Sequence, residues 1–398
     1  MTTDLTHPPV GRLRAAILAD PALQAELGAI EGVDDFLPRA IAVAQASGIA
    51  MTEPALRSVL ASDPLGLTRF ADGPPTADRP PPGWLPIQVA PIHGELCVDW
   101  GYFGRHVLRE PFFEDSIRTI LCRPFSRLAR HRTRLNDLPA CLAQLPVQRP
   151  SGFIFHMSRC GSTLAAQMLA ADPRNVVISE AAPLDTMVGL GHAVAGLPPE
   201  AHVQLIRDIV GALGHRRDAA HTRLFVKLDS WHALALPLFR RAFPDVPWVF
   251  FYREPSDVLA SQVLERGIQT VPEYMPPAIF GLTDDDREPS DAYCARVLAR
   301  TCEAALAAHG AGGGLLVNYR EMPDALFTRI LPHFGIVPDA QARAAMTAAA
   351  QFDAKTPALN FAPRNDLKRE ILTDDLRAVA DREIGPVYAA LEALRGKG

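Results

Sequence analysis

The sequence predicts an α/β fold: a mainly parallel sheet flanked by helices, with a helical N-terminal extension. Two observations support this. From Gly152 onward, short apolar runs alternate with helical segments, which favours a parallel sheet covered by helices on both faces. The chain has 398 residues, 48% of them hydrophobic, which suffices for one large domain and an extension.

Five apolar runs are expected to form the strands of this sheet. They are Phe153–Met157, Val176–Ser179, Leu224–Leu228, Trp248–Tyr252 and Leu315–Tyr319. A helix from Thr163 to Ala171 should follow the first strand and stop at Asp172 and Pro173. Sheets of this kind bind ligands beyond the carboxyl ends of their strands. The residues that follow the strands are therefore the ones expected to carry the function.

The chain before this sheet divides into three zones. Residues 1–72 are predicted to form a small helical domain, because apolar residues recur at helical spacing from Leu13 to Val43. The prolines of residues 73–94 indicate a semi-rigid linker. Residues 95–150 are rich in aromatic side chains and are interpreted as a helical layer packed on the main domain, which spans residues 151–398.

Composition and charge exclude several function classes. A net charge of −5 gives no general basic field, so nucleic acid is not an expected partner. The six cysteines form no CxxC pair, which argues against a zinc knuckle or a disulfide framework. The first residues do not resemble a signal peptide and no apolar run could span a bilayer, so we expect a cytoplasmic protein without a membrane partner. It could form homo-oligomers.

The segment after the first predicted strand has the features of an anion site. Ser158 to Thr163 connects this strand to a helix, so several backbone N–H groups and the positive helix end should converge. Gly161 permits close approach of the backbone, and Ser162 and Thr163 add hydroxyl donors. Arg159 adds a planar donor suited to phosphate or sulfate oxygens.

Two familiar anion loops do not fit this segment. A Walker A loop would place a lysine between the glycine and the hydroxyl residue, where Gly161 adjoins Ser162 directly. A cysteine-phosphatase loop would place an arginine at Ala166. Cys160 lies near a helix N-terminus, which lowers a thiol pKa, although it is otherwise a small loop residue. His156 is either a packing residue at the strand end or a ligand.

A second candidate phosphate site follows the strand Trp248–Tyr252. Arg253 should point into the crevice at the strand's carboxyl end, Pro255 begins a helix, and Ser261 lies two turns along it. Arg253 and Ser261 could therefore bind one phosphate from two sides. The alternative is that Arg253 forms a surface ion pair.

These two segments resemble the sulfotransferases that use 3′-phosphoadenosine 5′-phosphosulfate (PAPS). The run Ser158-Arg159-Cys160-Gly161-Ser162-Thr163 looks like the family's P-R-S-G-T-T loop, with departures at Ser158, Cys160 and Ser162. The segment from Arg253 to Ser261 resembles the family's R-D-P-R-D-x-x-x-S. The resemblance implies a P-loop-type fold in which the loop holds the 5′-phosphosulfate. It also implies that Arg253 and Ser261 hold the 3′-phosphate of PAPS and of its product, 3′-phosphoadenosine 5′-phosphate (PAP).

The layout is most similar to the tyrosylprotein branch of the family, and that similarity suggests catalytic roles. Glu180 stands where that branch has its base, and Lys227 resembles the lysine of its K-x-P segment, without the proline. Lys227 and Arg159 would stabilise charge on the bridging oxygen, so no divalent metal is required. Glu180 could instead be an ion-pair partner of Arg159 or Lys227.

A hydroxyl or amine of a small molecule or peptide is expected, and the N-terminal zone resembles the helical leader region of bacterial modified peptides. The irregular stretch Ile268–Asp291 should form part of the acceptor wall, and the basic run Arg364–Arg369 either folds over the cofactor or begins a solvated helix. A P-loop kinase-like phosphotransferase and a non-catalytic nucleotide-binding adaptor are the alternative functions.

Overall fold

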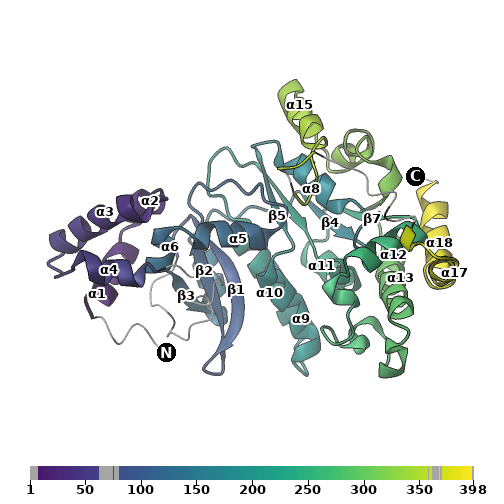
Figure 1. Cartoon of the computed structure of the whole chain (residues 1–398), viewed down its shortest axis with the longest axis horizontal. Helices are drawn as coiled ribbons and strands as arrows, with labels where there is room; N and C mark the ends of the chain where they lie inside the picture. The colour runs from purple at the N-terminus through teal and green to yellow at the C-terminus, as the bar shows by residue number, and fades with distance from the viewer. Residues whose placement is uncertain are drawn as a thin grey trace. The chain divides into compact units, whose positions relative to one another are not determined.

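The computed structural model describes residues 8–61, 75, 80–356, 358–360, 367 and 370–396. The basic run Arg364–Arg369 therefore lies almost entirely outside the described residues. The chain divides into two compact units, which are drawn in Figure 1. The first unit comprises Met1–Gln148, Ala181–Met187 and Asp208–Ala219, and the second comprises Arg149–Glu180, Val188–Arg207 and Ala220–Gly398.

Residues 8–61 contain four helices: α1 (Pro8–Leu18), α2 (Pro21–Gly28), α3 (Val33–Ala46) and α4 (Glu53–Val59). Buried contacts tie them to the rest of the first unit. Gln24 is 1% exposed, and its side chain accepts a 2.8 Å hydrogen bond from the Trp84 indole N–H. Arg14 donates to the carbonyl of Leu128 at 2.5 Å. The helices and the elements that follow them thus share one core.

The sequence prediction is wrong for part of the region between residues 73 and 150. Here the structure has an antiparallel sheet of three strands in the order β1 (Trp84–Ile92), β2 (Glu95–Tyr102) and β3 (His131–Arg134). Pro86 and Pro91 lie in β1, at the sheet edge, where a residue without an N–H is tolerated. The expected linker is thus a strand over Trp84–Ile92. The expected helical layer contains α5 (Phe113–Leu121), α6 (Pro124–Leu128) and α7 (Leu138–Leu142) beside the strands. The domain boundaries themselves stay predictions.

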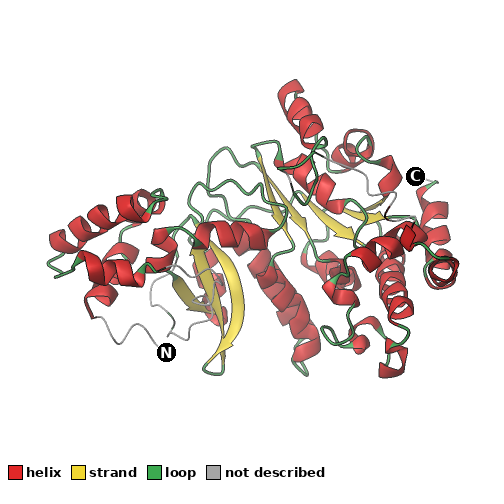
Figure 2. Cartoon of the chain, in the orientation of Figure 1, coloured by secondary structure: helices red, strands yellow, loops and turns green. Residues whose placement is uncertain are grey.

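The second unit confirms the predicted parallel α/β architecture. Its five strands run in the order β5-β6-β4-β7-β8, and each pairs with its neighbours in parallel. Their bounds are β4 (Gly152–His156), β5 (Asn175–Ser179), β6 (Arg223–Lys227), β7 (Trp248–Tyr252) and β8 (Gly314–Asn318), within one residue of the predicted runs. Figure 2 shows helices flanking this sheet.

The helices of this α/β region vary widely in length. Two of them, α9 (Ala182–Ala193) and α10 (Pro199–Leu213), contain residues of both units. Among the described residues, those wholly in the second unit are α8 (Ser162–Ala170), α11 (Leu236–Ala242), α12 (Pro255–Leu264), α13 (Ser290–His309), α14 (Leu331–His333), α15 (Ala340–Ala349), α17 (Asp374–Glu383) and α18 (Gly385–Arg395). The stretch 268–291 is irregular, as predicted, with three short 3₁₀ turns before α13 begins. Within the described ranges, no helix is both long and apolar enough to cross a membrane.

Helix α18 is fixed to the carboxyl ends of two strands through one carboxylate. Glu392 accepts hydrogen bonds from the Tyr252 hydroxyl at 2.5 Å and from the Asn318 amide at 3.0 Å. Burial alone would raise the pKa of Glu392, but hydrogen bonds from Arg395, Tyr252 and Asn318 outweigh it and lower the pKa to about 2. This carboxylate therefore stays ionised at neutral pH and holds the C-terminal helix beside β7 and β8.

Candidate functional site

The register of the parallel sheet brings the predicted site residues to one edge. Lys227, the last residue of β6, is level with Ile154 of β4 and Ser179 of β5. His156, the last residue of β4, is level with Phe251 of β7. The residues just beyond these ends therefore come from four neighbouring strands, as the parallel architecture requires.

The loop between β4 and α8 has a left-handed backbone at three positions. The φ angles are +78° at Ser158, +52° at Arg159 and +85° at Gly161. Non-glycine residues in this region cost of the order of 1–3 kcal/mol each and persist where the surroundings fix them. The loop leads directly into the N-terminus of α8, whose positive end favours an anion. The positive φ values show a tight turn before α8, and anion binding by this loop stays a prediction.

Tyr319 closes this loop on one side. A Cβ atom at Gly161 would lie only 2.5 Å from Cδ2 of the Tyr319 ring, so the close approach requires glycine. The guanidinium of Arg253 lies over the same ring, 4.2 Å from its centroid, in a cation–π contact. The ring thus packs between the loop and the arginine that follows β7.

Arg253 and Ser261 both contact Asp257, in the first turn of α12. The Arg253 guanidinium donates to the Asp257 carboxylate at 2.7 Å and 3.2 Å. The Ser261 hydroxyl donates to the Asp257 carbonyl at 2.9 Å, and Ser261 itself is 7% exposed. The two predicted phosphate ligands therefore lie beside the same helical turn, and Arg253 forms the ion pair that its strand-end position allowed.

Glu180 and Lys227 form an ion pair at the ends of β5 and β6. The Lys227 side chain is fully buried, whereas 20% of the Glu180 side chain is exposed. Burial by itself would raise the pKa of Glu180, but the Lys227 charge and hydrogen bonds from His156 and Lys227 hold the pKa well below its usual range. Glu180 is thus ionised and accessible, and it is the partner of Lys227 rather than of Arg159.

His156 connects this ion pair to the loop. The backbone N–H of Ser158 donates to Nδ1 at 3.0 Å, so the ring proton is on Nε2. Nε2 donates to the Leu228 carbonyl at 2.9 Å and lies 3.3 Å from Oε1 of Glu180. Burial and the nearby Lys227 charge lower the pKa of His156, which keeps the ring neutral. Both ring nitrogens are engaged, which fits a packing role at the strand end better than that of a ligand.

Cys160 points away from the crevice. Its thiol is fully buried and donates to the Phe251 carbonyl of β7 at 3.2 Å. Burial raises the pKa of Cys160 to about 12, which overrides the lowering expected at a helix N-terminus. The buried thiol fits the interpretation of Cys160 as a small loop residue, and Cys160 could contact an anion only through its backbone.

Arg159 belongs to a charged cluster that sequence analysis did not identify. Its guanidinium donates to Glu265, at the end of α12, at 2.5 Å. Lys355 lies 3.5 Å from the other oxygen of Glu265. Burial lowers the pKa of Lys355, and the Arg159 charge lowers it further. Two cations thus share one carboxylate beside the anion loop.

Gln262 is a further residue that the sequence did not reveal. It is fully buried beside Ser261, and its amide donates to the Ser158 hydroxyl at 3.2 Å. The only local signal for it was its place directly after Ser261. Glu265 and Lys355 carried no such signal, because their partners are distant in sequence.

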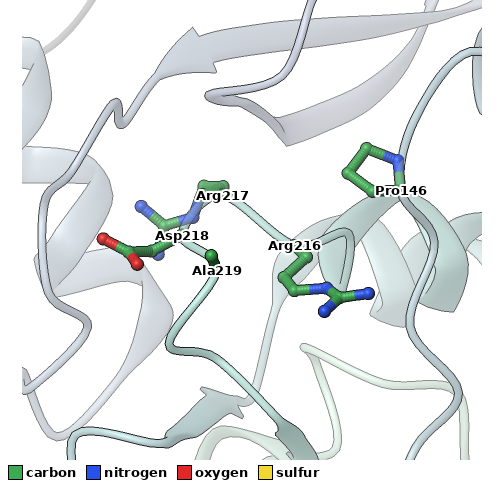
Figure 3. Close-up of a pocket in the computed structure, with 5 residues that line it drawn as sticks. All are labelled: Pro146, Arg216, Arg217, Asp218 and Ala219. Carbon is green, nitrogen blue, oxygen red and sulfur yellow. The ribbon is translucent and has the colours of Figure 1, made fainter.

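The first unit contains a separate open cavity of about 240 Å³, lined by Pro146 and by Arg216 to Ala219 (Figure 3). Arg217 is already engaged in the fold, because it donates to the carbonyls of Gly104 at 3.1 Å and His106 at 2.8 Å. The cavity contains none of the residues predicted to hold a ligand, so it is not the candidate site.

Comparison with known proteins gives structural likeness only. No family model matches the sequence, and no curated protein matches it. A sulfotransferase from Mycobacterium avium has a TM-score of 0.37 and 16% identity, covering 62% of this chain and 79% of that chain. A sulfotransferase from Alicyclobacillus acidocaldarius has a TM-score of 0.36 and 17% identity, covering 63% and 97%. The sulfotransferase domain of the Synechococcus PCC 7002 olefin synthase has a TM-score of 0.35 and 18% identity, covering 59% and 94%. At these values the likeness assigns no function, so function must be argued from the chain's own residues.

The left-handed loop can be tested with paired glycine substitutions in the second unit. Gly161→Ala should lower the free energy of unfolding in urea by about 1–3 kcal/mol, because the new Cβ meets Tyr319 and φ is positive. Gly189→Ala in α9, where no heavy atom lies within 4 Å of the new Cβ, should be neutral or stabilising by about 0.5–1 kcal/mol. Equal effects of the two changes would contradict the described loop conformation.

Proposed function

We propose that the protein transfers a sulfuryl group from PAPS to a hydroxyl or amine acceptor. The observation that carries the proposal is the convergence of three features at one sheet edge. These are the left-handed loop before α8, the buried Lys227 at the end of β6, and Arg253 after β7. The loop is the connection that leaves β4. Lys227 and Arg253 lie at the ends of β6 and β7, the two strands that pair with β4.

The residues present fit the two anionic ends of PAPS. The N–H groups of the loop and the N-terminus of α8 suit the 5′-phosphosulfate. Arg253, which precedes α12, and Ser261, within α12, suit the 3′-phosphate. The 3′-phosphate would thus have contacts of its own, separate from those of the 5′-phosphosulfate. These contacts would let the site distinguish PAPS from nucleotides without a 3′-phosphate.

Lys227 and Glu180 supply the groups that sulfuryl transfer needs. When bound, PAPS provides the sulfuryl group, and PAP is the leaving group. The bond from sulfur to the 5′-phosphate oxygen breaks while the acceptor oxygen or nitrogen bonds to sulfur. Lys227 Nζ and the Arg159 guanidinium stabilise the charge that develops on the bridging oxygen. Glu180 takes the acceptor's proton, which balances the reaction.

Glu180 can be both the partner of Lys227 and the base, because the ion pair between them changes when the donor binds. With Lys227 beside it, Glu180 is too weakly basic to remove a proton from an alcohol readily. An anion that draws Lys227 toward the bridging oxygen weakens this pair, and the pKa of Glu180 rises as its counter-charge leaves. The base would then become active when the sulfuryl donor is in place.

Replacing Arg253 tests the assignment of the 3′-phosphate site. Arg253→Ala should weaken binding of PAP about tenfold or more and change binding of AMP little, since a charge-assisted contact contributes about 1.5–3 kcal/mol. Calorimetry with both nucleotides measures this, with Arg382→Ala, which changes an exposed arginine of α17, as the control. Equal losses for PAP and AMP would show that Arg253 does not contact the 3′-phosphate.

Replacing Glu180 separates proton transfer from the positioning of Lys227. If Glu180 is the base, Glu180→Gln should bind PAP at least as tightly as the wild type and lose about 10²- to 10⁴-fold in turnover. If Glu180 only positions Lys227, turnover at saturating PAPS should fall little. Turnover is measured with the best acceptor from a screen of phenols, alcohols and amines. The control is Glu303→Gln, which changes an exposed glutamate of α13.

A further inference from the structure

Gln262 connects the loop between β4 and α8 with the irregular stretch that follows α12. Its side-chain amide N–H donates to the Ser158 hydroxyl at 3.2 Å, and its Oε1 accepts from the backbone N–H of Gly267 at 2.7 Å. Gln262 is 0% exposed, so these contacts are shielded from water. One buried amide thus links the loop of the proposed phosphosulfate site to the chain that leaves α12.

Gly267 is the anchor of the irregular stretch that follows. Its carbonyl accepts from the backbone N–H of Thr270 at 2.9 Å and from the Thr270 hydroxyl at 2.7 Å. A Cβ atom at Gly267 would lie 2.8 Å from the side-chain amide of Gln269, so the two residues pack closely. Beyond it, Ile268 and Tyr274 are 50% and 68% exposed. The turn therefore sets the start of the expected acceptor wall.

Ser158 is constrained from two directions. Its backbone N–H donates to His156 and its hydroxyl accepts from Gln262, while its φ is +78°. A ligand that shifts the Ser158 hydroxyl would therefore also act on the Gln262 amide. Because the same amide holds Gly267, restraint on one side reduces the freedom of the other.

We propose that Gln262 is a positioning residue that couples the anion loop to the acceptor-side stretch, so that binding of the sulfuryl donor orders residues 263–275. The inference rests on the proposed function and extends it, because it gives the order of assembly. The donor site forms first, and the acceptor wall is fixed through Gln262. Gln262 itself contacts neither the reacting atoms nor the acceptor.

Hydrogen–deuterium exchange with PAP as the probe tests this coupling without any acceptor. In the wild type, saturating PAP should slow exchange of the 263–275 amides about tenfold or more. Gln262→Met, of similar size, should bind PAP and lose that slowing. Ser158→Ala cuts the same link from the loop side and should lose the slowing too, at a PAP concentration that calorimetry shows to saturate this variant. The double variant should resemble Gln262→Met alone, because the two changes remove one connection.

The controls separate coupling from loss of folding. Gln351→Met alters an exposed glutamine and should keep the PAP-induced slowing. If Gln262→Met is unstable, Ser158→Ala carries the test alone. Slowing that persists in either variant, or a wild type that binds PAP without slowing at 263–275, would overturn the coupling. A wild type that binds no PAP, as measured by calorimetry, would refute the proposed function and this inference with it.

Discussion

The left-handed backbone between β4 and α8 is the constraint on which the site depends. Ser158 and Arg159 adopt a conformation that costs free energy, and the surrounding contacts hold it in place. Nδ1 of His156 accepts from the Ser158 N–H, the Cys160 thiol donates to β7, and Tyr319 packs against Gly161. Each contact comes from a strand of the sheet or from the residue that follows one.

Charge pairing is the second organising feature. Each predicted cation is held by a carboxylate: Lys227 by Glu180, Arg159 by Glu265 and Arg253 by Asp257. These pairs keep the cations ordered, although an anionic ligand must compete with each carboxylate. The competition is strongest at Lys227, because its side chain is fully buried and its pairing is least screened by water. A ligand with several charges, placed to meet all three cations together, is therefore favoured over a simple anion.

The sequence predicted what depends on local pattern. The apolar runs located the five parallel strands within one residue, and the glycine and hydroxyl residues of 158–163 located the loop. The sequence did not predict features that depend on neighbouring elements or on residues far away in the chain. Pro86 and Pro91 indicated a linker, but an edge strand accepts them because one side of the strand needs no N–H donors. Glu265 and Lys355 meet Arg159 across long sequence separations, which no local pattern encodes.

The central claim is that the anion loop and Arg253 form a PAPS site, and ligand-induced thermal stabilisation tests it most directly. PAP should raise the melting temperature, and EDTA should leave the increase unchanged. A ligand at about 100 times its Kd should add roughly 2.7 kcal/mol. Stabilisation by ATP that requires Mg²⁺, with none by PAP, would contradict the account and favour a kinase-like phosphotransferase.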